Sequence, residues 1–161
     1  MVINRRRRYG DWEGDTIVGK GRRSALITLV ERKSGLVRIG KLDNLASATT
    51  MRAARRCLKD LPSSLRRSAT FDNGSEFAEY ERLHRSLGLS VYFADPYCAW
   101  QRGSNENLNG LIRQYFPKGT DFHRVAPRDV QRIQQFLNER PRRRFNYQTP
   151  REVLGKRLCR N

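Results

Sequence analysis

The chain has 161 residues, a length that suits one domain of ordinary size. Thirty-three Lys and Arg residues stand against sixteen Asp and Glu, so the formal net charge is +17 at pH 7. An excess of this size indicates a polyanionic partner, usually nucleic acid, although charge alone leaves open a solvated basic surface or a ribosomal-type binding protein. No apolar stretch reaches the roughly 18 residues of a membrane span, and no signal-peptide pattern occurs, so we expect a cytoplasmic protein.

The three cysteines, Cys57, Cys98 and Cys159, are widely spaced. No CxxC pair occurs, and neither histidine, His84 or His123, lies near a cysteine in the sequence. A zinc site and a disulfide framework are therefore not expected. A reducing compartment agrees with this cysteine usage.

The N-terminal third of the chain predicts a β-meander. Strands are expected at residues 11–18, 25–31 and 36–39, because apolar and β-branched residues dominate these segments and Ser34-Gly35 is typical of a turn. Residues 1–9 are basic and show no periodic pattern, so we interpret them as a linker or as the stump of an upstream region.

The remainder of the chain predicts alternating helices and strands. The expected elements are helix 46–61, strand 68–71, helix 76–87, strand 89–94, helix 104–116 and helix 130–139, followed by a tail rich in Arg and Pro. Pro62 stops the first of these helices and Gly88 closes the second. This order predicts an α/β fold, with a mixed sheet and helices packed on its faces.

Three acidic residues stand where a fold can gather charges that are distant in sequence. Asp15 lies within an apolar-flanked strand, Asp72 at the end of a short strand, and Glu106 in the first turn of a helix. Each alone has a simpler interpretation: a strand-end charge, an Asx turn before Asn-Gly, and a helix-start charge favoured by the helix dipole. The functional interpretation therefore depends on all three occurring together with specific neighbours.

A cluster of three carboxylates requires a counter-charge, because like charges a few ångströms apart raise each other's pKa. Magnesium suits oxygen ligands and keeps water and substrate phosphates in its shell. Two such ions, roughly 3.5–4 Å apart, can activate an attacking oxygen and stabilise a leaving one. A basic surface that holds DNA beside an acidic cluster that holds metal explains why both features occur in one chain.

Three segments resemble the catalytic motifs of retroviral integrases and related transposases. They are Trp12–Thr16 (WEGDT), Phe71–Phe77 (FDNGSEF) and Gly103–Asn109 (GSNENLN). Thirty-three residues separate Asp72 from Glu106, a spacing similar to that of insertion-sequence transposases, and Arg113 stands seven positions after the Glu as in that family. The opening, residues 10–17, and the ending, residues 140–150, resemble the bacterial insertion-sequence transposases of the number-thirty family.

The resemblance covers residues 9–154 and implies a ribonuclease-H-like mixed five-stranded sheet flanked by helices. It implies a catalytic core at residues 10–155, a tail at 156–161, and an N-terminal DNA-binding region that these residues lack. Asp15, Asp72 and Glu106 would be catalytic and would bind two Mg²⁺ ions, for which Mn²⁺ can substitute. Water would cut DNA at the element ends, and the freed 3′-hydroxyl would attack target DNA, in an oligomer of the chain at the bacterial nucleoid.

Beyond the acidic triad, the expected DNA contacts are Arg113, Asn109, Asn73, Arg102, Arg142 and Arg143. A solvated Arg113 is an equal alternative on sequence alone. Asp11 and Glu13 share a strand face with Asp15 by the period of two, and only the resemblance excludes them as metal ligands. Trp12 is expected in the core, whereas Trp100 is interpreted either as core or as a DNA probe.

Two other functions compete with an active transferase. One is a truncated or repurposed core that binds DNA without cutting it. The other is a different ribonuclease-H-like nuclease, such as a junction resolvase or an RNA–DNA hybrid nuclease. The third motif and Arg113 argue against this nuclease, and DNA joining discriminates between the two enzymes.

Overall fold

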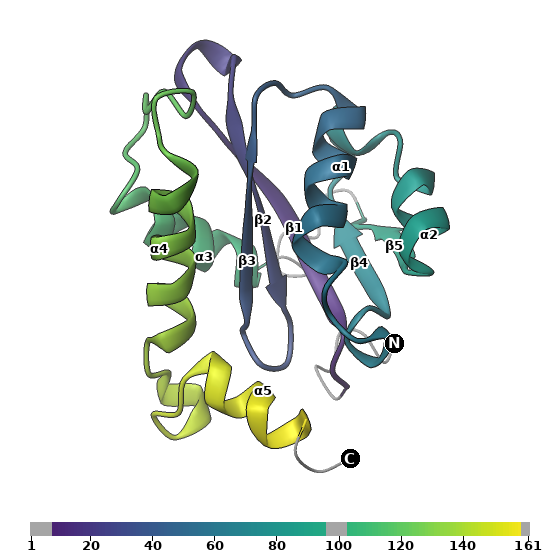
Figure 1. The fold of residues 1–161 in the computed structure, drawn as a ribbon, viewed down its shortest axis with the longest axis vertical. Coiled ribbons are helices and arrows are strands. Elements are labelled where there is room, and N and C mark those ends of the chain that lie inside the picture. The colour runs from purple at the N-terminus through teal and green to yellow at the C-terminus, as the bar shows by residue number, and fades with distance from the viewer. Residues whose placement is uncertain (1–7, 96–102, 159–161) are drawn as a thin grey trace.

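The computed structural model describes residues 8–95 and 103–158. Its described residues form one five-stranded mixed sheet with the order β3-β2-β1-β4-β5 (Figure 1). The strands are β1 (Asp11–Val18), β2 (Ala25–Glu31), β3 (Val37–Leu42), β4 (Ser68–Phe71) and β5 (Ser90–Phe93). The first three are antiparallel neighbours, while β4 runs parallel to both β1 and β5. The predicted meander and the predicted five-stranded mixed sheet are confirmed.

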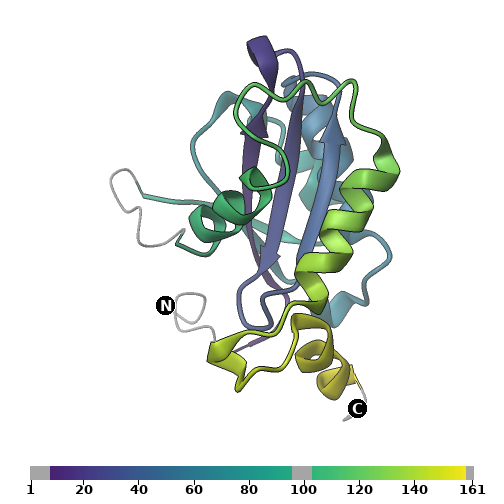
Figure 2. The same ribbon diagram turned by 90° about the vertical axis from the view of Figure 1, so that its left-hand side faces the viewer.

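Helices cover both faces of this sheet (Figures 1 and 2). On one face, α1 (Ser47–Leu58) contacts β3 and α2 (Glu81–Leu87). On the other, α3 (Gly103–Arg113) contacts β1 and β2, and α4 (Pro127–Glu139) contacts β3. The last helix, α5 (Pro150–Leu158), contacts α4. No helix in the described part of the chain is both long and apolar enough to cross a membrane.

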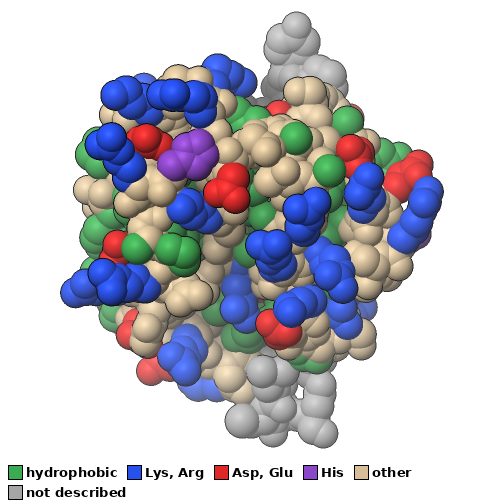
Figure 3. All heavy atoms as spheres, turned by 45° about the horizontal axis from the view of Figure 1, so that its top comes forward, with side chains coloured by type: hydrophobic (Ala, Val, Ile, Leu, Met, Phe, Trp, Pro, Cys, Tyr) green, Lys and Arg blue, Asp and Glu red, His purple; other side chains and the backbone are tan. Residues whose placement is uncertain are grey.

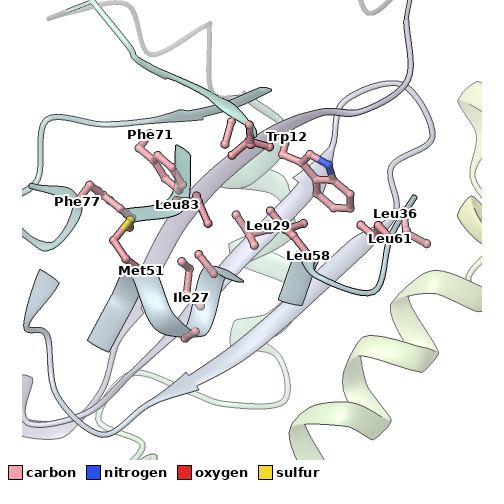
Figure 4. Close-up of a cluster of buried hydrophobic side chains, with 14 of the residues drawn as sticks. Trp12, Ile27, Leu29, Leu36, Met51, Leu58, Leu61, Phe71, Phe77 and Leu83 are labelled. Atoms are coloured by element: carbon pink, nitrogen blue, oxygen red, sulfur yellow. The ribbon is translucent and has the colours of Figure 1, made fainter. Parts of the chain in front are cut away.

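The larger hydrophobic core lies between the sheet and α1 (Figure 4). Trp12 is 1% exposed, and its indole Nε1 donates a hydrogen bond of 2.8 Å to the backbone oxygen of Leu65, which confirms its predicted place in the core. The rings of Phe71 and Phe77 stack at a centroid distance of 4.5 Å. A Cβ at Gly14 would run into the ring of Phe71, so this position of β1 suits glycine.

The second core lies between the sheet and the helices α3 and α4. It contains Ile17, Leu26, Val30, Val37, Ile39, Leu108, Ile112, Phe116, Phe122, Val130 and Leu137. The strands supply alternate residues to the two cores, because successive side chains of a strand point to opposite faces.

Two predicted elements differ from the structure. The helix expected at residues 76–87 is a short 3₁₀ turn, Ser75–Phe77, followed by α2, because Phe77 packs into the core. The tail expected after residue 139 contains α5, which continues past residue 155. Thr149 and Glu152 cap the N-terminus of α5 reciprocally, with backbone to side-chain hydrogen bonds of 2.7 and 3.1 Å.

Candidate active site

Asp15 and Asp72 belong to neighbouring parallel strands at their carboxyl-terminal edge. The β1–β4 pairing aligns Asp11 with Ser68 and Glu13 with Thr70. Continuing this register by two residues places Asp15 beside Asp72, on the face of the sheet that α3 covers. Both carboxyl groups are half-buried. The topology therefore brings these two predicted residues to one edge of the sheet.

Helix α3 carries the third acid to the same region. The side-chain Nδ2 of Asn109 donates a hydrogen bond of 2.9 Å to Oδ2 of Asp15. Glu106 lies three residues earlier, one helical turn from this contact, and its side chain is exposed. Within residues 8–95 and 103–158, no three His, Cys, Asp or Glu side chains are grouped closely enough to hold a metal ion. The three acids thus lie in one region of the structure, but their carboxylates are not grouped around one metal position.

Asn109 is itself fixed by a buried hydroxyl. The Oγ1 of Thr28 lies 3.0 Å from Oδ1 of Asn109 and 3.3 Å from the backbone oxygen of Asp15. Thr28 pairs directly with Asp15 across β1 and β2, and it is fully buried. Because an amide has distinct donor and acceptor ends, the Thr28 contact turns the NH₂ end of Asn109 towards Asp15.

The loop after β4 holds Asp72 in an Asx turn. The backbone N–H of Gly74 donates a 3.0 Å hydrogen bond to Oδ1 of Asp72. A Cβ at Gly74 would lie 2.5 Å from Oε2 of Glu76 and 2.9 Å from that carboxylate oxygen of Asp72, so the loop suits glycine here. Thr16 Oγ1 donates a 2.9 Å hydrogen bond to Glu76 Oε1, which ties β1 to this loop. Sequence reasoning did not single out Glu76.

The two other acids of β1 are buried and partnered. The Ser68 hydroxyl donates to Asp11 at 2.6 Å, and Arg8 forms hydrogen bonds of 2.7 and 2.9 Å with both oxygens of Asp11. The backbone N–H of Asn105 donates to Glu13 at 3.4 Å, and Arg32 lies 3.9 Å from the same carboxylate. Glu13 thereby contacts the start of the helix that carries Glu106, a role that sequence reasoning missed.

Arg113 has contacts within the protein that the sequence did not predict. Its Nη2 donates a 2.9 Å hydrogen bond to the backbone oxygen of Val18, at the end of β1. Its Nη1 lies 3.3 Å from the backbone oxygen of Pro117, beyond the end of α3. Burial lowers the pKa of the guanidinium. Arg113 is half-buried and so is not a fully solvated side chain, and its contact with DNA stays a prediction.

Three of the four remaining predicted DNA contacts lie in the described residues. Asn73 donates a 3.3 Å hydrogen bond to the backbone oxygen of Ala94 and bridges the ends of β4 and β5. Arg142 and Arg143 line a pocket together with Asn107, the neighbour of Glu106 in α3. Burial, followed by the charge of Arg140, lowers the pKa of Arg142. Arg102 and Trp100 lie outside the described residues.

Solved structures share this arrangement of sheet and helices. The catalytic core domain of BIV integrase superposes with a TM-score of 0.69 and 18% identity over 94% of this chain and 97% of that one. A chain of the simian T-cell lymphotropic virus intasome superposes with a TM-score of 0.68 and 19% identity, over 89% of this chain and 53% of that one. The fold is therefore ribonuclease-H-like, as the sequence predicted.

The sequence itself matches the family described as integrase core domain over residues 5–99. The chain belongs to this family. It is 41% identical over 160 residues to the transposase for insertion sequence element IS4351 of Bacteroides fragilis, covering 99% of this chain and 49% of that protein. It is 42% identical over 152 residues to the InsI transposase of Escherichia coli, covering 94% of this chain and 39% of that protein. The chain thus spans about half or less of the length of these curated relatives.

Proposed function

We propose that the chain is the catalytic core of a DNA transposase that cuts and joins DNA strands at the ends of an insertion sequence. The observation that carries this proposal is the contact between Asn109 and Asp15, which joins the helix of Glu106 to the sheet edge of Asp15 and Asp72. The transposases similar to this chain and its charge of +17 support the same substrate, DNA.

The proposed reaction has two steps of the same kind. In the first, a water oxygen attacks phosphorus, the bond from phosphorus to the 3′-oxygen breaks, and a 3′-hydroxyl and a 5′-phosphate remain. In the second, that 3′-hydroxyl attacks a target phosphodiester, and the target's own 3′-oxygen leaves as a hydroxyl. The number of phosphodiester bonds is unchanged in the second step, so no energy source is needed.

Asp15, Asp72 and Glu106 are the residues proposed to hold divalent metal. Their donors are carboxylate oxygens, which suit Mg²⁺ and Mn²⁺ and not a softer ion. Bound metal would supply charge to polarise the reacting phosphate and lower the pKa of the attacking water. The exposed side chain of Glu106, one helical turn from Asn109, leaves its carboxylate accessible to a metal ion and to DNA.

The chain's own residues position the acids and the DNA. Asn109 holds the Asp15 carboxylate, and Thr28 sets the orientation of that amide. Arg142 and Arg143 would hold backbone phosphates beside Asn107, because guanidinium groups match phosphate geometry. We further propose an oligomer assembled on paired DNA ends at the bacterial nucleoid, with Asn73 and Arg102 near the DNA.

The deciding experiment compares the chain with Glu106→Gln on a labelled DNA duplex in Mg²⁺, in Mn²⁺ and in chelator. The variant keeps the shape of the side chain and removes its charge. We expect cutting and joining only from the unchanged chain with metal. The matched control is Glu139→Gln, an exposed glutamate of α4, which should act like the unchanged chain.

Titration calorimetry with Mn²⁺ gives a readout that does not depend on turnover. We expect metal binding by the chain and by Glu139→Gln, and much weaker binding by Glu106→Gln. Cutting without joining would favour a plain nuclease. Equal DNA binding by both proteins with neither metal binding nor cutting would favour a core that binds DNA without acting on it.

A further inference from the structure

A second concentration of basic side chains lies on the opposite face of the sheet from the carboxylates. Helices α1 and α2 contact each other there, and a hollow between them is lined by Arg52, Arg55, Arg82 and Arg85. Figure 3 shows Lys and Arg side chains gathered on its right-hand side, where these two helices lie. None of the motifs discussed above includes these residues.

The helical period explains why the arginines line one hollow. Met51, Ala54 and Leu58 form the buried side of α1, so Arg52 and Arg55, three residues apart, face outward together. On α2, Arg82 and Arg85 have the same separation and are exposed. The arginines of α1 therefore line one side of the hollow and those of α2 the other, with Met51 also in its lining.

The two helices differ in how their arginines are neutralised. On α2, Arg82 pairs with Glu79, and Arg85 pairs with Glu81 at 2.6 Å. On α1, neither Arg52 nor Arg55 forms an ion pair with any carboxylate of residues 8–95 and 103–158. Helix α1 contains no acidic residue at all. A hollow with uncompensated charge focuses the positive potential of the surface.

We propose that this hollow, defined by Arg52, Arg55, Arg82 and Arg85, is a second binding site for the phosphate backbone of duplex DNA. Guanidinium groups bind phosphate oxygens in pairs, which a solvated lysine face does less well. A second copy of this chain is a poor occupant, because its sixteen acids among thirty-three basic residues give it the same sign of charge. The sheet separates the hollow from Asp15, so a duplex held here is a different segment from the one being cut.

The inference goes beyond the proposed function, because binding here needs neither metal nor cutting. Its test is the salt dependence of duplex binding. Binding is measured by the fluorescence anisotropy of a labelled duplex of arbitrary sequence, in the presence of chelator. The double variant Arg52→Ala/Arg55→Ala is compared with Arg128→Ala/Arg132→Ala, which removes equal charge from the exposed surface of α4.

We expect the α1 double variant to bind about tenfold more weakly near 0.1 M salt, and its slope of log K against log salt to fall by about two, since each lost phosphate contact removes roughly 0.9 from that slope. The α4 variant should change by less than half as much. Lysine at both α1 positions should restore the slope, since the charge returns. Equal losses from both alanine variants would show only a general effect of net charge and would overturn the proposal.

Photo-crosslinking locates the contact independently. Ser86 lines the hollow and is exposed, so a photoreactive residue there should form adducts with duplex DNA and lose them in the α1 double variant. Adducts with an acidic polypeptide but not with DNA would overturn the choice of ligand. The binding assays can be repeated in Glu106→Gln, so failure of this site and failure of the catalytic proposal are distinguishable.

Discussion

The two faces of the sheet are built from the same strands but have different chemistry. Beneath α1 and α2, the alternate residues are apolar, as at Trp12, Leu29 and Phe71. Beneath α3 and α4, the part formed by β2, β3 and Ile17 of β1 is also apolar, whereas the rest of β1 and β4 is polar. The buried polar residues of β1 and β4 are Asp11, Glu13, Ser68 and Thr70, and Thr28 of β2 borders them, since it pairs with Asp15.

This difference indicates how a small domain holds buried charge. Burying a carboxylate costs free energy that its partners offset only in part, so a charged face adds little to folding. The apolar face supplies that stability, and it does so through residues adjacent to the acids: Phe71 precedes Asp72, and Gly14 precedes Asp15. Changes on the polar face should therefore impair chemistry, and changes on the apolar face should impair folding.

The largest expected effect is on the polar face. Asp15→Asn keeps the shape of the side chain and removes the charge proposed to bind metal. We expect DNA cutting to fall on the order of 10³-fold or more, since metal contributes several kcal/mol to transition-state stabilisation. The midpoint of thermal unfolding should remain near that of the unchanged chain. Single-turnover cutting and calorimetry measure the two quantities, and a large loss of stability would contradict the division between the faces.

The converse change is Leu29→Ala on the apolar face. Leu29 is fully buried and next to Thr28, so its loss leaves a cavity in the main core. We expect the free energy of unfolding to fall by about 2–5 kcal/mol. Cutting per folded molecule, measured at low temperature, should be nearly unchanged. Urea unfolding, monitored by circular dichroism, gives the stability. A loss of cutting larger than the loss of folded protein would contradict the division between the two faces.

The sequence predicts the apolar face better than the polar one. Runs of apolar and β-branched residues locate the five strands and place Trp12 in the core, because burial of large apolar residues is largely a local pattern, whereas the order of the strands in the sheet is not. Arg113 and Asn109 were less predictable. Their partners, Val18 and Asp15, are 95 and 94 residues away, and nothing in a helical period shows which distant carbonyl or carboxylate a polar side chain meets.

Helix α5 is a different kind of omission, since the sequence contains its signal. Thr149-Pro150-Arg151-Glu152 has the spacing of a capping box with proline at the first helical position. The abundance of arginine around it instead predicts an irregular tail. Hydrogen bonds to Thr149 lower the pKa of Glu152, as expected for a carboxylate that caps a helix.

A smaller effect concerns Cys57, which packs against the larger core. Burial raises the pKa of its thiol from 9.0 to about 11, and Arg38 and Arg56 oppose this shift only in part. The folded state therefore favours the neutral thiol, whose stabilising contribution is complete below pH 9 and is lost as pH rises towards 11. At pH 10 the loss should be about 1–2 kcal/mol.

The matched variant for this prediction is Cys57→Ala, which has no thiol to titrate. Between pH 8 and pH 10, the urea midpoint of the unchanged chain should fall by more than that of the variant. All other titratable groups are the same in both proteins, so their effects cancel. A difference that stays constant with pH would mean that water reaches the thiol.

The smallest expected effect lies at Thr28, where the apolar and polar halves of the α3 face meet. Leu26 and Val30, two residues to either side, belong to the apolar core, while the Thr28 hydroxyl reaches Asn109 at 3.0 Å. Thr28→Val keeps the shape and extends the apolar half by one residue. The free energy of unfolding should fall by about 0.5–1.5 kcal/mol, because Asn109 loses a partner but its half-buried amide can still reach water.

The same variant should reduce cutting by about tenfold, since a free Asn109 amide no longer holds the Asp15 carboxylate in one position. Thr28→Ser is the informative control: it keeps the hydroxyl and loses the methyl group, so it should cut nearly as well as the unchanged chain while being less stable. If instead valine preserved cutting and serine impaired it, packing and not the hydrogen bond would position Asp15. The boundary between the two halves of this face would then be set by shape alone.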